Sequence, residues 1–109
     1  MGAVVETILI NETMNDGWTV HLYYSPTYQQ YVAYGLSAYI VNKVFQGVKS
    51  SYETDVQMPM VKVDDIKVEM LKKTMVCVVL KERQYKRLET MTSYNDNRYS
   101  EWANNLREF

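Results

Sequence analysis

Cysteine and histidine are almost absent from this chain of 109 residues, which has one of each, Cys77 and His21. A single cysteine cannot form an internal disulfide, so the fold needs no oxidising compartment. The usual zinc sites require four protein ligands, or three with a water molecule, and one histidine with one cysteine cannot supply them. Glycine is scarce too, and the sequence has neither a phosphate-binding loop nor a dinucleotide-binding fingerprint. We therefore expect no metal and no cofactor.

Long apolar runs and a strong charge of either sign are also missing. No segment approaches the ~20 apolar residues of a membrane span. No charged start followed by an apolar run marks a signal peptide. The net charge of −1 argues against a protein that binds nucleic acid or membrane over its whole surface. We therefore expect a cytoplasmic protein without a membrane partner.

Apolar and aromatic residues are spread along the whole chain. They amount to 47% of it, with 23% charged residues, which is enough for one core and typical of globular domains. The length suits a single domain, 1–109. Short proteins without catalytic motifs are common in viruses and mobile elements, and such an origin is expected on that general ground only.

The polar and apolar pattern predicts an α+β domain. Its sheet is expected to be largely antiparallel, with helices packed on it, in the order β-β-β-α-β-(α)-β-β-α. The expected strands are 4–10, 18–24, 31–34, 56–63, 75–80 and 85–91. The expected helices are 37–45, 64–71 and 94–108.

Single features decide several of these predictions. Residues 4–10 are apolar and β-branched, as strands are. Ser37 is the expected N-cap of the first helix, and residues 48–55 after that helix are interpreted as a polar connection. Pro59 is typical of a sheet edge or a bulge.

The pattern leaves an alternative open for segment 64–71 but not for segment 75–80. Segment 64–71 fits a helix that begins at Asp64 or Asp65, and a strand is the alternative. Residues 75–80 are six consecutive apolar residues, which indicates a central strand buried on both faces.

Catalytic chemistry has few candidates. His21 could act as a general base, since its ordinary pKa is near neutrality, but no nucleophile or orienting partner is marked by spacing. Cys77 lies between Val76 and Val78 and is more simply a small buried apolar residue. No catalytic residue is assigned.

Tyrosine is present in unusual number. The chain has ten, and several fall between Trp18 and Tyr34, where strand alternation would expose some of them. Exposed tyrosines anchor protein interfaces or stack on single-stranded nucleic acid. The alternative is that aromatic pairs across strands only stabilise the sheet.

Basic residues concentrate between Lys72 and Arg87, where six bases accompany one acid, Glu82. At a predicted turn they could contact phosphates, or they could be solvated charges that prevent aggregation. The candidate surface for a protein partner or nucleic acid combines both features and consists of Tyr23, Tyr28, Tyr31, Lys81, Arg83, Lys86 and Arg87.

The last helix carries an aromatic stripe. Its members recur three or four residues apart and so line one helical face, which packs on the chain's own sheet or on a partner. They are Tyr99, Trp102, Leu106 and Phe109.

Binding is therefore favoured over catalysis. The first hypothesis is a non-enzymatic interaction protein, a homodimer or the ligand of a protein partner, which uses the tyrosine-rich hairpin, the last helix or an edge strand 56–63. The alternative is a nucleic-acid-binding protein that uses the candidate surface. A second alternative is an enzyme that uses His21.

Overall fold

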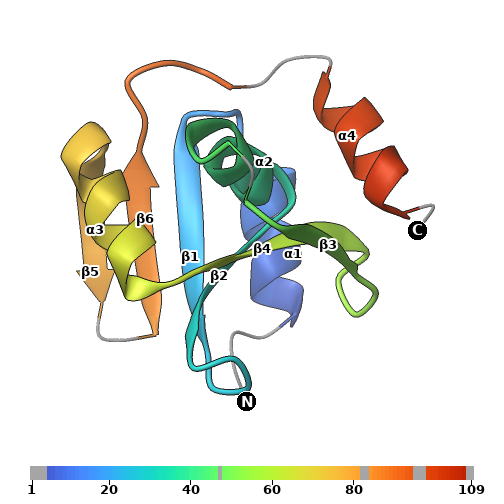
Figure 1. Ribbon diagram of the computed structural model, residues 1–109, viewed down its shortest axis with the longest axis horizontal. Coiled ribbons are helices and arrows are strands. Elements are labelled where there is room, and N and C mark those ends of the chain that lie inside the picture. Colours follow the sequence, from blue (N-terminus) through green and yellow to red (C-terminus); the bar gives the residue numbers. More distant parts are fainter. Residues whose placement is uncertain (1–4, 47, 82–83, 95–97, 108–109) are drawn as a thin grey trace.

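In the part of the chain that the structure describes, three β-hairpins, each preceded by a helix, are followed by a final helix (Figure 1). The structure, a computed structural model, describes residues 5–46, 48–81, 84–94 and 98–107, and for 77–81 the backbone only. The elements are α1 (Val5–Thr13), β1 (Thr19–Ser25), β2 (Gln30–Tyr34), α2 (Gly35–Val44), β3 (Ser50–Glu53), β4 (Met58–Val63), α3 (Asp65–Thr74), β5 (Val76–Lys81), β6 (Tyr85–Glu89) and α4 (Arg98–Arg107).

The strands form one sheet in the order β3-β4-β2-β1-β6-β5. Every neighbouring pair is antiparallel. The prediction of an α+β fold with an antiparallel sheet and packed helices is therefore confirmed. No helix in the described ranges is long and apolar enough to cross a membrane.

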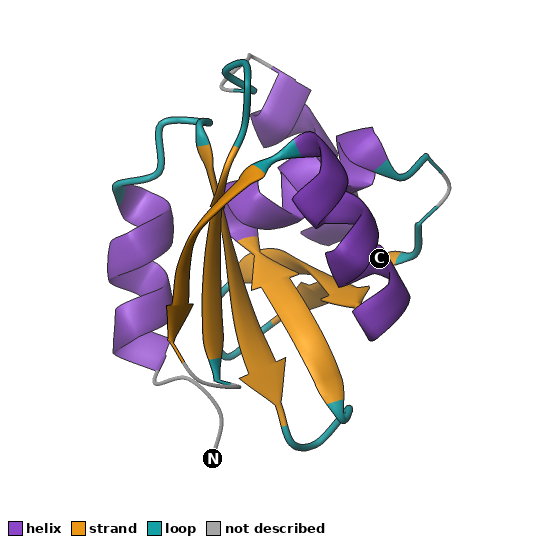
Figure 2. Ribbon diagram, turned by 90° about the vertical axis from the view of Figure 1, so that its left-hand side faces the viewer, coloured by secondary structure: helices purple, strands orange, loops and turns teal. Residues whose placement is uncertain are grey.

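Helices cover both faces of the sheet (Figure 2). On one side, here called the α2 face, α2 and α3 bury the main core, which includes Leu22, Ile40 and Leu71. On the other side, the α1 face, α1 contributes Ile8 to a smaller cluster with Tyr23 and Val32. Side chains along each strand alternate between these two faces, because successive residues of a strand point in opposite directions.

The predicted first strand, 4–10, is wrong: its described residues, 5–10, belong to helix α1. Its buried residues are Ile8 and Glu12, which lie four positions apart and therefore on one side of a helix. The prediction rested on the β-branched residues, and it took no account of Glu12, whose buried carboxylate binds another element. In place of the three consecutive strands predicted at 4–10, 18–24 and 31–34, the structure has a hairpin of β1 and β2 covered by this helix.

Ser37 is not the N-cap of α2, which begins two residues earlier, at Gly35. The cap position is Tyr34, and its side chain makes no capping bond. Instead, the carboxylate of Glu12 accepts the backbone N–H of Ser37. The helix is thus capped by a residue from another element, which a local sequence pattern cannot reveal.

Two strands occupy positions other than those predicted. Strand β4 lies between β3 and β2 and is not an edge. Its pairing with β2 ends at Met60, so Pro59 lies beyond that ladder and its missing N–H is tolerated there. The polar connection 48–55 contains β3, which covers the other side of β4.

Strand β5 is an edge strand, so the prediction of a central strand buried on both faces is wrong. Val76, at its start, is 58% exposed. An uninterrupted apolar run identified a strand correctly but not its position, which depends on which strand of the β5–β6 hairpin pairs with β1.

Helix α3 confirms the helical interpretation of 64–71. Asp64 is its N-cap and accepts a hydrogen bond from the backbone N–H of Lys67 at 2.9 Å. Helix α4 also lies where it was predicted, with its described part at Arg98–Arg107.

Candidate functional site

The predicted tyrosine surface does not exist as one surface. Tyr23 and Tyr31 are only 2% and 6% exposed, so neither ring is free to stack on a base. They lie on opposite faces of the sheet, because Tyr31 pairs with Tyr24, the residue after Tyr23. Tyr28, in the loop after β1, is exposed.

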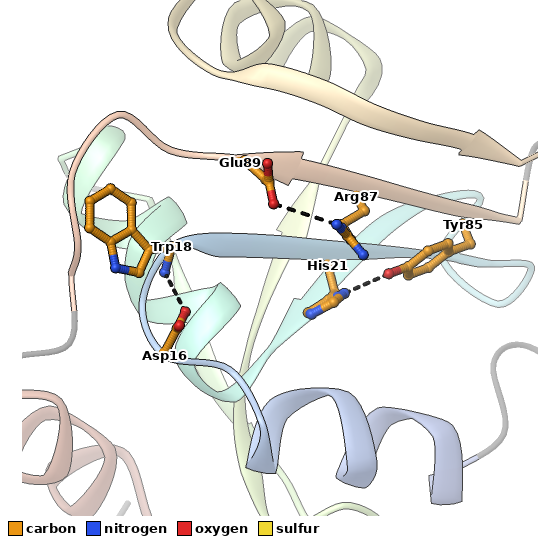
Figure 3. Close-up of polar contacts among 6 residues, drawn as sticks. All are labelled: Asp16, Trp18, His21, Tyr85, Arg87 and Glu89. Carbon is orange, nitrogen blue, oxygen red and sulfur yellow. Dashed lines mark hydrogen bonds and ion pairs between the residues drawn. The ribbon is translucent and has the colours of Figure 1, made fainter.

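The basic residues of that surface are also divided between the faces. Lys86 lies on the α2 face, with Nζ 5.2 Å from the ring centre of Tyr31. Arg87 lies on the α1 face, where its Nη2 is 3.4 Å from Oε2 of Glu89 (Figure 3). Arg83 and the side chain of Lys81 lie outside the described residues. The described members therefore do not form a phosphate-binding stripe.

Two residues of the predicted α4 stripe, Tyr99 and Trp102, pack against the rest of the protein. Tyr99 and Trp102 contact Tyr39 of α2, with ring centres 5.7 Å and 5.4 Å apart. Leu106 is half-buried, and Phe109 lies outside the described residues. The two aromatic residues thus hold α4 against the chain's own core.

His21 lies on the α1 face, and its ring is buried between β1 and α1 (Figure 3). Its Nδ1 is 2.6 Å from the hydroxyl oxygen of Tyr85, on the adjacent strand β6. Burial, and then the positive charge of Arg87, lower the pKa of His21 to about 4. The imidazole is therefore neutral near pH 7 and can accept the Tyr85 proton, a structural contact that gives no support to a catalytic role.

A buried carboxylate joins α1 to the start of α2. One oxygen of Glu12 accepts the backbone N–H of Ser37 at 3.0 Å, and the other accepts the Ser37 hydroxyl at 2.7 Å. Asn15 donates to Glu12 at 3.2 Å and to the carbonyl of Thr19 at 2.8 Å. The Ser37 hydroxyl in turn accepts the backbone N–H of His21 at 2.9 Å. This set, the Glu12 network, connects α1, β1 and α2.

The charge of Glu12 is only partly compensated. Burial raises the pKa of Glu12 from 4.5 to about 7, although hydrogen bonds from Ser37 and Asn15 act in the opposite direction. The carboxylate lies at the N-terminus of α2, where the helix dipole favours a negative charge. Glu12 consequently changes its protonation close to physiological pH.

Gly35 makes this approach of α1 to α2 feasible. Its φ is +57°, which disfavours any residue with a side chain. A Cβ added there would be 3.0 Å from Sδ of Met58 and 3.2 Å from Cβ of Glu12. Glycine is thus required both by the backbone conformation and by the contact with Glu12.

A cavity of about 360 Å³ lies beside the N-terminal half of α1. Its walls come from α1, from strands β1 and β2, and from the loops that close the β1–β2 and β3–β4 hairpins. Four tyrosines line it, together with two acids: Tyr23, Tyr24, Tyr28, Tyr34, Glu53 and Asp55. We call it the tyrosine cavity.

The tyrosine cavity has an apolar floor and a charged rim. Ile8, Val32 and Val56 are buried, whereas Tyr28 and Asp55 are exposed. Burial, and then the charge of Glu53, raise the pKa of Tyr34. Among the described residues that line the cavity, none is basic.

Neither site had a clear sequence signal. The Glu12 network joins residues from three elements, and its central pair, Glu12 and Ser37, lies 25 residues apart in the sequence. The number of tyrosines drew attention to the β1–β2 hairpin, but Glu53 ends a strand, β3, and Asp55 follows it, in a segment that was predicted as a connection. Across the described ranges, no three His, Cys, Asp or Glu side chains cluster as metal ligands.

Comparisons with protein-family models, with curated proteins and with solved structures give no match.

Proposed function

We propose that this chain is a non-catalytic interaction protein that self-associates through the outward face of α1. The observation that carries the proposal is that α1 is apolar on both sides. Ile8 faces inward, while Leu9 and Ile10 are 38% and 53% exposed and Met14, just after the helix, is 79% exposed. A contiguous exposed apolar patch of this kind is typical of a protein interaction site.

The outward residues of α1 form a continuous surface. Leu9, Ile10, Thr13 and Met14 surround one shallow hollow of about 300 Å³. Spacings of three and four residues bring these side chains together on one helical face. Such a face can take a knob from a facing helix.

A second copy of the chain is the occupant that the charges favour. A two-fold interface brings each residue of a patch against the same patch of its partner, so like charges at its centre would repel. The outward face of α1 carries one charged residue, Glu6, at its N-terminal end. In an antiparallel helix pair the two copies of Glu6 lie at opposite ends. The centre, at Ile10, then remains uncharged.

The size of the face sets the expected affinity. A nine-residue helix is about 14 Å long at 1.5 Å per residue. Paired helices of that length bury less than a standard interface of about 1,600 Å². We therefore expect a dimer that forms at micromolar concentrations, in exchange with the monomer.

Gel filtration with light scattering at tens of micromolar protein tests this proposal. The wild-type chain should give a dimer mass, and Ile10→Glu should give a monomer. Ile66→Glu is the matched control, because Ile66 is also an isoleucine exposed on a helix, at 72%, and should leave the dimer intact. A wild-type monomer, or a dimer that survives Ile10→Glu, would refute the proposal.

A further inference from the structure

The tyrosine cavity has the chemistry of a site for an organic cation. Its rim carries Glu53 and Asp55, and the lining includes Tyr28, which is exposed, and Tyr34, which is half-buried. Aromatic rings attract cations through the negative potential over their faces, and aromatic cages recognise alkylated ammonium groups in this way. The two carboxylates add charge attraction, while the apolar floor suits methyl or methylene groups.

One of the cavity tyrosines already binds a cation of this chain. Lys62, on strand β4, places Nζ 4.0 Å from the ring centre of Tyr28. Lys62 is not among the residues that line the cavity. The Tyr28 ring therefore attracts an ammonium group in the folded protein, independently of the two acids.

The dimensions agree with a small ligand. Pockets for small molecules usually measure about 300–1,000 Å³, and this cavity is about 360 Å³. Because Tyr28 and Asp55 are exposed at the rim, a ligand could enter while its apolar part reaches Val32 and Val56.

We propose that the tyrosine cavity binds an alkylated ammonium group, between the tyrosine rings and the carboxylates of Glu53 and Asp55. An anionic ligand is disfavoured, since it would meet two negative charges at the rim. This inference concerns a different surface from the outward face of α1 and stands whether or not the chain dimerises.

Calorimetric titration with choline tests the proposal against a neutral isostere, in which a tert-butyl group replaces the trimethylammonium group. We expect saturable binding of choline with a dissociation constant of about 1 mM or tighter. The isostere should bind at least ~5-fold more weakly, because it fills the same volume without the charge. Failure of choline to saturate, or equal binding of the isostere, would overturn the proposal.

Variants assign the binding to the cavity. Tyr28→Leu should weaken choline binding by roughly 3- to 10-fold, whereas Tyr28→Phe, which keeps the ring, should retain most of it. The double variant Glu53→Gln with Asp55→Asn should weaken it by at least ~3-fold. Glu101→Gln, an exposed acid on α4, is the matched control. Unchanged binding in both Tyr28→Leu and the double variant would refute the assignment.

A last titration distinguishes two sources of the same chemistry. A short peptide that carries trimethyllysine presents the ammonium group of choline on a protein side chain. Tighter binding of the peptide would assign the site to a modified lysine, and tighter binding of choline would assign it to a free metabolite. Circular dichroism of each variant verifies that the fold is intact before the affinities are compared.

Discussion

Replacement of Glu12 by glutamine should change how the stability of the protein depends on pH. Glutamine has nearly the same shape and can still accept the backbone N–H of Ser37, but it cannot ionise. The carboxyl group of Glu12 has a pKa of about 7 in the folded protein, against an ordinary 4.5. Between these values the folded state keeps a proton that the unfolded state has released.

The sign and size of the effect follow from this difference. Because the folded state binds more protons, the free energy of unfolding falls as pH rises from 4.5 to 7. At about 1.4 kcal/mol per pH unit, the loss amounts to about 3 kcal/mol. Below that range Glu12 is neutral in both states, and above it the carboxylate is ionised in both.

His21 opposes Glu12 in the wild-type chain. Its pKa is lowered from 6.5 to about 4 on folding, so the folded state binds fewer protons in that window and stability rises with pH. The two effects nearly cancel between pH 4.5 and 6.5. The wild-type profile alone is therefore uninformative, and the difference between wild type and Glu12→Gln isolates Glu12.

Urea unfolding, followed by tryptophan fluorescence from pH 4.5 to about 8, measures this difference. Glu12→Gln should gain about 3 kcal/mol relative to wild type across the range. Glu6→Gln is the matched control, since Glu6 lies on the same helix but is exposed, and its profile should parallel wild type. Parallel profiles for wild type and Glu12→Gln would show that the reasoning about the buried carboxylate is wrong.

Three further predictions concern the same region. Ser37→Ala leaves the His21 N–H and one Glu12 oxygen without their partner and should cost about 2–4 kcal/mol in urea unfolding. Gly35→Ala should cost about 1–3 kcal/mol in the same assay, because its φ is +57° and its Cβ would meet Glu12. His21, as the single histidine, should show by proton NMR a pKa of about 4.

Each of these three has a distinct contrary result. Ser51→Ala, at an exposed serine of β3, is the control for Ser37→Ala, and equal losses in both would deny the buried hydrogen bonds. A Gly35→Ala variant as stable as wild type would refute both the backbone strain at φ +57° and the close contact with Glu12. A His21 ring that titrates near pH 6.5 would show that it is exposed to solvent.

The sequence predicted the elements whose determinants are local. The alternation of side chains between two faces identified β1 and β2. An aspartate identified the start of α3, where Asp64 accepts a hydrogen bond from the backbone N–H of Lys67. Predictions failed where the determinant is distant. Residues 5–10 are helical because Ile8 and Glu12 are buried against other elements, and β5 is an edge strand because β6 pairs with β1.

The candidate site was less predictable than the fold for the same reason. The tyrosines identified the β1–β2 hairpin, which lines the cavity. Tyr23 and Tyr31, however, are buried, so their rings cannot contact a partner as the sequence predicted. Tyr34 and Glu53 line the same cavity only because β2 and β3 both pair with β4. No local pattern encodes that neighbourhood.

The scarcity of glycine bears on the tyrosine cavity itself. The β1–β2 and β3–β4 hairpins have loops of equal length, and in both the last loop residue is a glutamine with φ of 54°, Gln29 and Gln57. Glycine would adopt this conformation without strain, whereas another residue costs about 1–2 kcal/mol. The residue before each glutamine, Tyr28 or Val56, lines the cavity. In each hairpin a glutamine with positive φ thus follows directly after a residue that lines the cavity. Backbone strain of this kind concentrates at binding sites.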